Sequence, residues 1–268
     1  MPYDHERMVS FLLNYYGERI KIFLKDLKDQ MYTLQKCIDC QTIFQEFIPT
    51  DEFSNKLYEE IISPNKSLKK KLNFPVTQFN TYFNEMIAFE NLFKKKSFDI
   101  KVLEFGAGWG FWSRLAQSLN FKVNVSEISA TRNKFLKDNN LKLINELDKT
   151  NDKFDLIYSD QTFEHLNYPK EIFNSLYKIL NQSGFIFLKF PNSLFFKKKI
   201  NKSYVPSKDA VHPLEHINLF TINSFKSIIK DLNMSVINFD KYYNFYLKKY
   251  PRMIINFFKF DKILIKKN

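Results

Sequence analysis

A cluster of glycines in the stretch VLEFGAGWG constrains this chain more than any other feature. The sequence holds five glycines, and three of them, Gly106, Gly108 and Gly110, lie in this one stretch. An apolar run, KVLEF, precedes them, and FWSRLAQSL, with apolar residues at helical spacing, follows. Strand, glycine turn and helix in that order form a first βα loop, where residues without a Cβ let a nucleotide-like ligand lie against the backbone. The sequence therefore predicts a ligand-binding loop at residues 106–110.

Short apolar runs alternate with helical patterns over residues 73–250, which is typical of βαβ units and a mostly parallel sheet. We expect six strands, at residues 100–106, 122–128, 141–144, 154–160, 184–190 and 235–240. Residues 1–72 have helical patterns and contain the two cysteines, so they are predicted to form a helical N-terminal extension. Residues 251–268 form a separate basic, aromatic tail.

Composition excludes several classes of protein. The chain has 268 residues, a hydrophobic fraction of 44% and no apolar run of membrane-spanning length. Its net charge of +12 comes almost entirely from lysines spread along the chain, whereas reading of base edges relies on arginine, so no nucleic-acid partner is expected. Two cysteines and an N-terminus without an apolar signal region favour a cytoplasmic location.

The spacing of the glycines bears on which ligand the loop binds. Dinucleotide sites use G-x-G-x-x-G, but this loop reads G-x-G-x-G and follows Glu104. A carboxylate at that position would repel a pyrophosphate and would suit a ligand that carries an ammonium and a sulfonium group.

At this point the sequence resembles the class I S-adenosylmethionine-dependent methyltransferases, over roughly residues 75–240. VLEFGAGWG is similar to their motif I, KVNVSEIS ends in the acidic Glu127, and FDLIYSDQTFEHL, LNQSGFIFLKFPN and HPLEHINLFTINSF match later segments in the right order. The resemblance implies a Rossmann-like sheet of seven strands flanked by helices, with Glu127 binding the ribose hydroxyls. It also implies that S-adenosylmethionine is held by Glu104, Phe105, Gly106, Ala107, Gly108, Trp109, Gly110, Glu127, Ile128, Asp160 and Gln161.

Histidines occupy the segments where such an enzyme binds its acceptor. Methyl transfer from a sulfonium needs aligned reactants, and it needs a base only when the acceptor must lose a proton. His165 is a candidate for that base, with helix capping or packing as the alternative. His212 and His216 are candidates for lining the acceptor pocket, with pinning of their loop to the sheet as the alternative.

No metal site is predicted. Some quinone-pathway relatives bind a metal in the segment of Glu164 and His165, but Gln161 replaces a carboxylate here. Cys37 and Cys40 resemble half of a zinc-ribbon-like module found in some sugar-modifying methyltransferases. Because structural zinc takes four ligands and no earlier cysteine exists, we interpret the pair as a metal-free remnant. Zinc completed by His5 or by a second chain is the alternative.

The tail mixes apolar residues with lysines. Two interpretations stay open: a terminal helix packed on the domain, or an amphipathic helix that touches a membrane surface or a lipid-linked substrate.

Together these patterns predict a methyltransferase that acts on a small-molecule acceptor, with a sugar or a surface-polysaccharide precursor suggested by the half-ribbon resemblance. The alternatives are an inactive methyltransferase-like partner subunit and an NAD(P)-dependent oxidoreductase. The acceptor, the methylated atom and the oligomeric state do not follow from the sequence.

Overall fold

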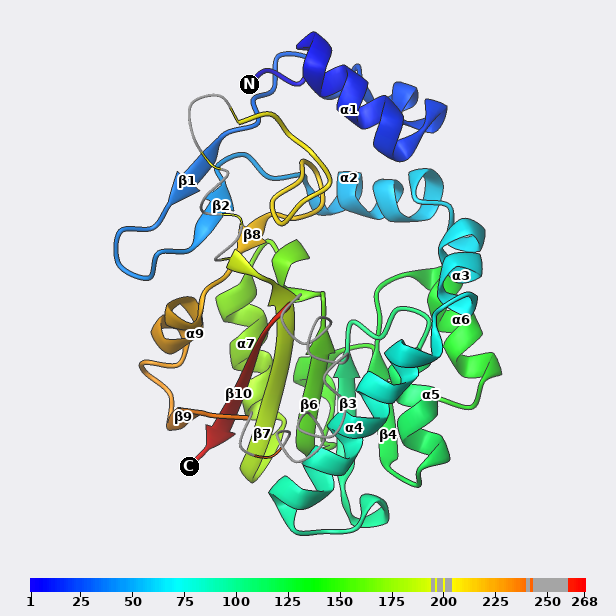
Figure 1. The fold of residues 1–268 in the computed structure, drawn as a ribbon, viewed down its shortest axis with the longest axis vertical. Coiled ribbons are helices and arrows are strands. Elements are labelled where there is room, and N and C mark those ends of the chain that lie inside the picture. Colours follow the sequence, from blue (N-terminus) through cyan, green and yellow to red (C-terminus); the bar gives the residue numbers. More distant parts are fainter. Residues whose placement is uncertain (194–195, 197–199, 201–203, 240–241, 243–259) are drawn as a thin grey trace.

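The computed structural model describes residues 1–193, 196, 200, 204–239, 242 and 260–268. Its centre is a sheet of seven strands in the order β5-β4-β3-β6-β7-β10-β9, with helices on both faces (Figure 1). The first five strands pair in parallel, and β10 pairs antiparallel with β7 and β9. This confirms the predicted Rossmann-like α/β fold. The strands are β3 (Lys101–Phe105), β4 (Lys122–Ser126), β5 (Lys142–Leu143), β6 (Phe154–Asp160), β7 (Leu180–Pro191), β9 (Met234–Ile237) and β10 (Phe260–Lys267).

Side chains on the two faces of the sheet form two separate apolar clusters. On one face, Val102 and Phe187 pack with Phe89 and Trp112 from the helices above them. On the other face, Ile157 and its neighbours pack under helices α7 and α9. The strands are therefore buried on both sides, which fits their nearly continuous apolar sequences. The flanking helices are α4 (Val76–Phe93), α5 (Phe111–Ser118), α6 (Ala130–Asp138), α7 (Pro169–Lys178) and α9 (Ile222–Ile228).

The seventh strand lies in the segment that the sequence analysis set apart as a tail. β10 fits between β7 and β9, and Ile263, Leu264 and Ile265 are buried in the core. The boundary at residue 250 and the terminal helix are therefore wrong for residues 260–267, because alternating contacts on both faces of the sheet stabilise an extended strand there. The remaining apolar residues proposed for membrane contact, Ile254, Ile255, Phe257 and Phe258, lie outside the described residues.

The N-terminal region contains several helices and a short hairpin. Its helices are α1 (Glu6–Tyr16), η1 (Glu18–Phe23), α2 (Asp51–Lys56), the π-helical η2 (Leu57–Ile61) and α3 (Pro64–Leu72). Thr50 and Ser63 cap the first turns of α2 and α3 with their hydroxyl groups. Nowhere in the described segments is a helix both long and apolar enough to cross a membrane.

The hairpin joins this region to the rest of the molecule. Its strands β1 (Leu34–Lys36) and β2 (Ile43–Gln45) extend into a three-stranded sheet with β8 (Asn218–Leu219). Phe44 of β2 pairs with Asn218, directly after the loop that carries His212 and His216. The N-terminal region thereby reaches the C-terminal edge of the central strands (Figure 1).

Candidate functional site

The glycine loop, residues 106–110, has the backbone conformation that its sequence predicts. Gly106, Gly108 and Gly110 have φ values of 74°, 56° and 64°, a region that other residues adopt only with strain. A Cβ on Gly106 would lie 2.2 Å from the Thr162 hydroxyl oxygen, whereas a Cβ on Gly108 would meet no described atom within 4 Å. Gly106 is thus required by packing, and Gly108 leaves bare backbone facing open space.

Glu127 reaches this loop from the end of β4. Its carboxylate accepts hydrogen bonds from the backbone N–H groups of Gly108 at 2.7 Å, Ile128 at 3.0 Å and Ser129 at 2.9 Å. Arg132 lies 3.7 Å from the same carboxylate. The acidic side chain predicted to bind a ribose therefore lies against the loop and is held in place by backbone donors.

Glu104, on β3, is buried below the loop. One of its oxygens accepts from the N–H and the hydroxyl of Ser113, at 3.1 and 2.5 Å, in the first turn of α5. Burial raises the pKa of Glu104 to about 8, against the lowering effect of the Ser113 hydroxyl. Glu104 is therefore largely protonated at neutral pH unless a cation comes close to it.

A buried ionic network under the site was missed by the sequence analysis. Lys189 of β7 lies 2.7 Å from Asp160, 3.1 Å from Glu85 and 3.0 Å from the Tyr158 hydroxyl. Burial would lower the pKa of Lys189, but the two carboxylates outweigh it and hold the pKa above its ordinary value. Asp160, a predicted cofactor residue, is thus anchored by a cation. A lone lysine in the apolar run GFIFLKF was the available signal.

The other predicted cofactor residues differ in what their side chains contact. Phe105 packs edge-on against Phe163, and Ala107 is buried in the core, so both offer backbone to a ligand. Ile128 is 78% exposed. Gln161 adopts a positive φ of 54° and donates its N–H to the Lys189 carbonyl at 2.9 Å.

Helix α3 contacts the glycine loop from the N-terminal region. The indole N–H of Trp109 donates to the Ser67 hydroxyl at 3.2 Å, and the ring packs against Phe135 of α6. Burial lowers the pKa of Lys71, near the end of α3, and the charges of Asp160 and Glu104 oppose that shift. A cationic side chain therefore approaches the carboxylates of the site from α3.

His165 lies just beyond β6, in the short helix η5 (Phe163–His165). Its Nδ1 is 2.9 Å from the Glu215 carbonyl oxygen and 3.0 Å from the Tyr58 hydroxyl. A carbonyl only accepts, so Nδ1 carries the proton and Nε2 is left with a lone pair. Burial lowers the pKa of His165, which keeps the ring neutral.

The structure brings His212 and His216 together with His165. The centroids of the His165 and His216 rings are 4.8 Å apart, and those of the His216 and His212 rings are 3.9 Å apart. Glu215 accepts from the Tyr16 hydroxyl at 2.9 Å and lies 3.4 Å from His212. We call His165, His212, Glu215 and His216, with Tyr16 and Tyr58, the histidine cluster.

The titration behaviour of the cluster follows from its burial. Burial would raise the pKa of Glu215, but His212 and His165 outweigh it, and the pKa is lowered. Burial, followed by the neighbouring His165 and His212, places the pKa of His216 well below its ordinary value. The cluster therefore combines a Glu215 carboxyl of lowered pKa with the His165 and His216 rings, whose pKa values burial lowers.

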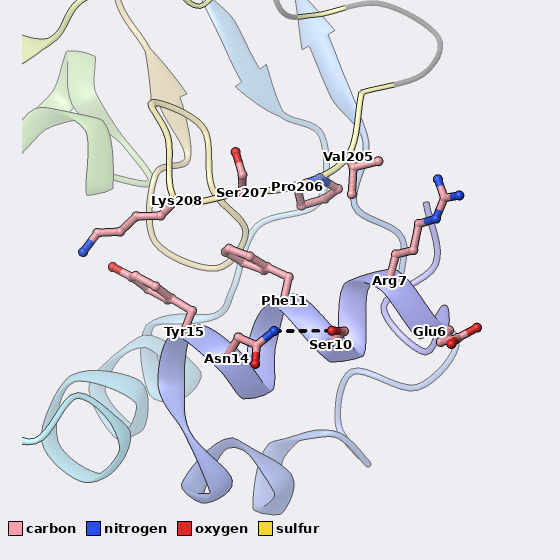
Figure 2. A pocket seen from close by; sticks show the side chains of 10 residues that line it. All are labelled: Glu6, Arg7, Ser10, Phe11, Asn14, Tyr15, Val205, Pro206, Ser207 and Lys208. Atoms are coloured by element: carbon pink, nitrogen blue, oxygen red, sulfur yellow. Dashed lines mark hydrogen bonds between the residues drawn. The ribbon is translucent and has the colours of Figure 1, made fainter.

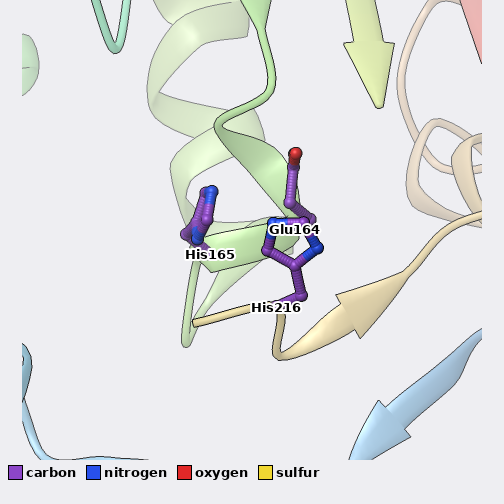
Figure 3. A group of neighbouring side chains, drawn as sticks. All are labelled: Glu164, His165 and His216. Carbon is purple, nitrogen blue, oxygen red and sulfur yellow. The ribbon is translucent and has the colours of Figure 1, made fainter. Parts of the chain in front are cut away.

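Glu164 lies next to the rings of His165 and His216 (Figure 3). Its side chain is fully buried, and neither carboxylate oxygen has a hydrogen-bond partner within the described part of the chain. Burial raises the pKa of Glu164 well above its ordinary value. One of its carboxylate oxygens, one ring nitrogen of His165 and one ring nitrogen of His216 all lie within 4.8 Å of one another.

Cys37 and Cys40 lie in the turn between β1 and β2, and both are free thiols. The Cys40 sulfur is 3.0 Å from the Thr42 hydroxyl. His5, the alternative zinc ligand, accepts from the Arg7 N–H and caps α1. Farther along the hairpin, Gln45 donates to the carbonyl oxygens of His212 and His216 at 3.3 and 3.0 Å. The hairpin thus supports the loop of the histidine cluster.

A hollow of about 620 Å³ opens beside the histidine cluster (Figure 2). Phe11 and Tyr15 of α1 stack at 5.7 Å and form one wall, and residues 205–208 form the other. Tyr15 also packs edge-on against His212 at 5.2 Å, and the Lys208 ammonium lies 5.1 Å from the Tyr15 ring. Aromatic faces and a cation therefore lie next to the cluster.

Two solved structures with a similar fold are methyltransferases. The plantazolicin methyltransferase BpumL in complex with SAH is 15% identical, with a TM-score of 0.58, covering 80% of this chain and 93% of that chain. The 1,6-didemethyltoxoflavin-N1-methyltransferase of Burkholderia thailandensis, bound to 1,6-didemethyltoxoflavin and S-adenosylhomocysteine, is 9% identical, with a TM-score of 0.53, covering 88% and 99%. No curated protein matches the sequence.

A family model described as a methyltransferase domain matches residues 79–238. That range begins in α4 and ends just after β9. It includes the glycine loop, Glu127, Asp160 and the three histidines of the cluster, whereas Tyr16 and Tyr58 lie before it. The family uses S-adenosylmethionine, in agreement with the cofactor that the resemblance implies. The chain belongs to the methyltransferase domain family.

Proposed function

We propose that this protein transfers the methyl group of S-adenosylmethionine to a small-molecule acceptor, and that the acceptor is a sugar or a surface-polysaccharide precursor. The observation that carries the proposal is that two half-sites adjoin: the glycine loop with Glu127, which we call the cofactor half, and the histidine cluster. Thr162 packs against Gly106 of the glycine loop, and three positions later His165 begins the histidine cluster. The loop that would hold the cofactor therefore adjoins the histidines that would meet the acceptor.

The residues at the loop fit the cofactor. The bare backbone at Gly108 leaves room for a ligand to lie on the chain, and the Glu127 carboxylate offers a pair of acceptors for the two ribose hydroxyls. Asp160, and Glu104 once ionised, supply negative charge for the ammonium and sulfonium groups. When bound, the cofactor supplies an activated methyl group, and the chain's own residues align the acceptor with it.

The histidine cluster supports a role for His165 at the acceptor. The Glu215 carbonyl fixes its Nδ1 proton, so Nε2 is the atom that can accept a proton or a hydrogen bond from an acceptor hydroxyl. His212 contacts Tyr15, which lines the hollow, and His216 contacts His165. The stacked Phe11 and Tyr15, with Ser10 and Asn14 beside them, suit the apolar face and the hydroxyl groups of a sugar ring.

Calorimetric titration with S-adenosylmethionine, S-adenosylhomocysteine and NADH tests the cofactor. We expect binding of the first two, weakened about 10- to 100-fold in Glu127→Ala, because the carboxylate makes charge-assisted bonds there. Glu146→Ala, which removes an exposed carboxylate, is the matched control. Binding of NADH alone would favour an oxidoreductase. Absence of S-adenosylmethionine binding, with or without NADH binding, would refute the proposal.

Methyl transfer to a panel of nucleotide sugars and free sugars tests the acceptor. With a productive acceptor, His165→Ala is expected to lower kcat by about 10²–10⁴-fold if the histidine acts as a base, with the affinity for S-adenosylhomocysteine unchanged. Unchanged turnover would remove that role. Cofactor binding without turnover of any acceptor would favour an inactive partner subunit.

A further inference from the structure

Glu164 presents a buried carboxylate without a partner, and such a group is costly. Its side chain is fully buried, and both oxygens lack a hydrogen-bond partner among the residues with described positions. Nearly all buried polar groups in proteins are paired, and an unpaired one calls for a specific explanation. A bound cation is one explanation, since it would satisfy both oxygens.

His165 offers this position a nitrogen whose state is fixed by its surroundings. Its Nδ1 proton is directed to the Glu215 carbonyl oxygen at 2.9 Å, with the Tyr58 hydroxyl at 3.0 Å. This leaves the lone pair on Nε2. Metal-binding histidines commonly have this arrangement, in which one nitrogen donates to a backbone carbonyl and the other coordinates the ion.

His216 offers a second nitrogen from a different part of the chain. Its Nδ1 is buried, and no described group pairs with it. Its ring packs against the rings of His165 and His212, with centroids 4.8 and 3.9 Å apart. The loop before β8 is itself tied to the N-terminal hairpin by Gln45. The His216 ring is therefore held in place, while its Nδ1 has no hydrogen-bond partner among the described residues.

We propose that Glu164, His165 and His216 bind one divalent transition-metal ion of the zinc class. Their three ligand atoms lie within 4.8 Å of one another. Ligands at about 2.0–2.2 Å from a tetrahedral ion are roughly 3.3–3.6 Å apart, so movements of about 1 Å would complete the site. Two imidazoles and a carboxylate suit zinc, whereas magnesium prefers oxygen ligands.

Three protein ligands leave a coordination position for another molecule. Glu164 is buried, and the two histidine rings are partly exposed. The hollow where we place the acceptor adjoins the same cluster, because Tyr15 packs against His212. In that role, which rests on the proposed function, the ion would bind an acceptor hydroxyl oxygen and lower the pKa of that hydroxyl, so that its proton passes to water. His165 would then be a ligand, which is the alternative to the base role that His165→Ala tests.

Cobalt binding tests the site in a chain that lacks the competing thiols. The background is Cys37→Ser with Cys40→Ser, stripped with a chelator, and the probe is Co²⁺ followed by its visible absorption and by metal content. We expect one Co²⁺ per chain with weak visible bands and no thiolate charge-transfer band. Glu164→Gln and His216→Ala are each expected to weaken binding at least 100-fold. His212→Asn, a neighbouring histidine outside the ligand set, should stay within about threefold.

Two results would overturn the proposal. One is absence of Co²⁺ binding in the cysteine-free chain, and the other is equal binding by Glu164→Gln. Circular dichroism of each metal-free variant establishes that it is folded, and Glu164→Gln keeps the shape of the side chain if His216→Ala does not fold. Titration of the same metal-free protein with S-adenosylhomocysteine reports on the proposed function separately, since Glu127 and the glycine loop do not include any of the three ligands.

Discussion

Around the glycine loop, the groups that hold the backbone come from nearby in the sequence, whereas the histidine cluster is assembled from distant segments. Glu104, Ser113 and Glu127 all lie on the first two βα units, and their bonds link neighbouring strands and helices. The histidine cluster combines Tyr16 and Tyr58 of the N-terminal region with η5 and the loop before β8. Local sequence can therefore define the first half-site, but the second depends on how separate parts of the molecule dock.

The largest expected effect comes from removing the cation beneath the cofactor half. Lys189→Met leaves the buried Glu85 and the partly exposed Asp160 without their cationic partner, which is expected to lower the free energy of unfolding by about 3–5 kcal/mol. The exposed pair of Lys178 and Asp148 is the control, and Lys178→Met should cost less than about 1 kcal/mol. Urea denaturation measures both. Similar losses in the two variants would mean that the network contributes no more than a surface pair.

Two alanine substitutions separate the roles of glycines in one loop. Gly106→Ala places a Cβ against Thr162 at a positive φ and is expected to cost about 2–4 kcal/mol of stability. Gly108→Ala has open space, so it should cost about 1 kcal/mol while weakening S-adenosylhomocysteine binding about tenfold or more. Denaturation and calorimetry are measured on both proteins. The distinction fails if Gly108→Ala is the less stable of the two.

The pKa of Glu104 predicts how stability changes with pH in the cofactor half. Its folded pKa of about 8 is raised above the unfolded value of about 4.3. The stabilising contribution is therefore complete below the unfolded pKa and is lost as pH rises toward the folded pKa. Between pH 6 and 8 we expect wild type to lose about 2–3 kcal/mol relative to Glu104→Gln. Parallel pH profiles for the two proteins would contradict the shift.

The smallest effect should appear at the contact between the hairpin and the histidine cluster. Gln45→Leu removes bonds to the carbonyl oxygens of His212 and His216 and is expected to cost about 1 kcal/mol. S-adenosylhomocysteine affinity should stay within twofold, because the glycine loop is unaffected. Gln35→Leu, on the exposed side of the same hairpin, is the control. A cofactor affinity that fell with Gln45→Leu would show that the two half-sites are coupled.

Sequence patterns predicted the features that depend on short stretches of chain. Apolar runs defined the strands, and the glycine spacing defined the loop, because positive φ and close approach depend on the local residues. Glu127 was placed correctly at the end of β4 for the same reason. The fold class followed from the alternation of runs.

The features that were missed depend on tertiary contacts. β10 was read as part of a tail, because its mixed lysine and isoleucine pattern becomes a strand only between β7 and β9. Lys189 could not be assigned a role from sequence, because it pairs with Glu85 on α4, about a hundred residues earlier in the chain. The orphaned carboxylate of Glu164 could not be seen from sequence at all, since burial and missing partners are properties of the assembled structure.

The position of β10 also has a consequence for biosynthesis. A ribosome makes β7 and β9 before the strand that pairs with both, so the long apolar edge of β7 emerges without its final neighbour. Unpaired strand edges invite association with other chains, and sheets formed late in synthesis are exposed to it for longer. Completion of this sheet therefore waits for residues 260–267, and a nascent chain would depend on chaperones or rapid translation until they appear.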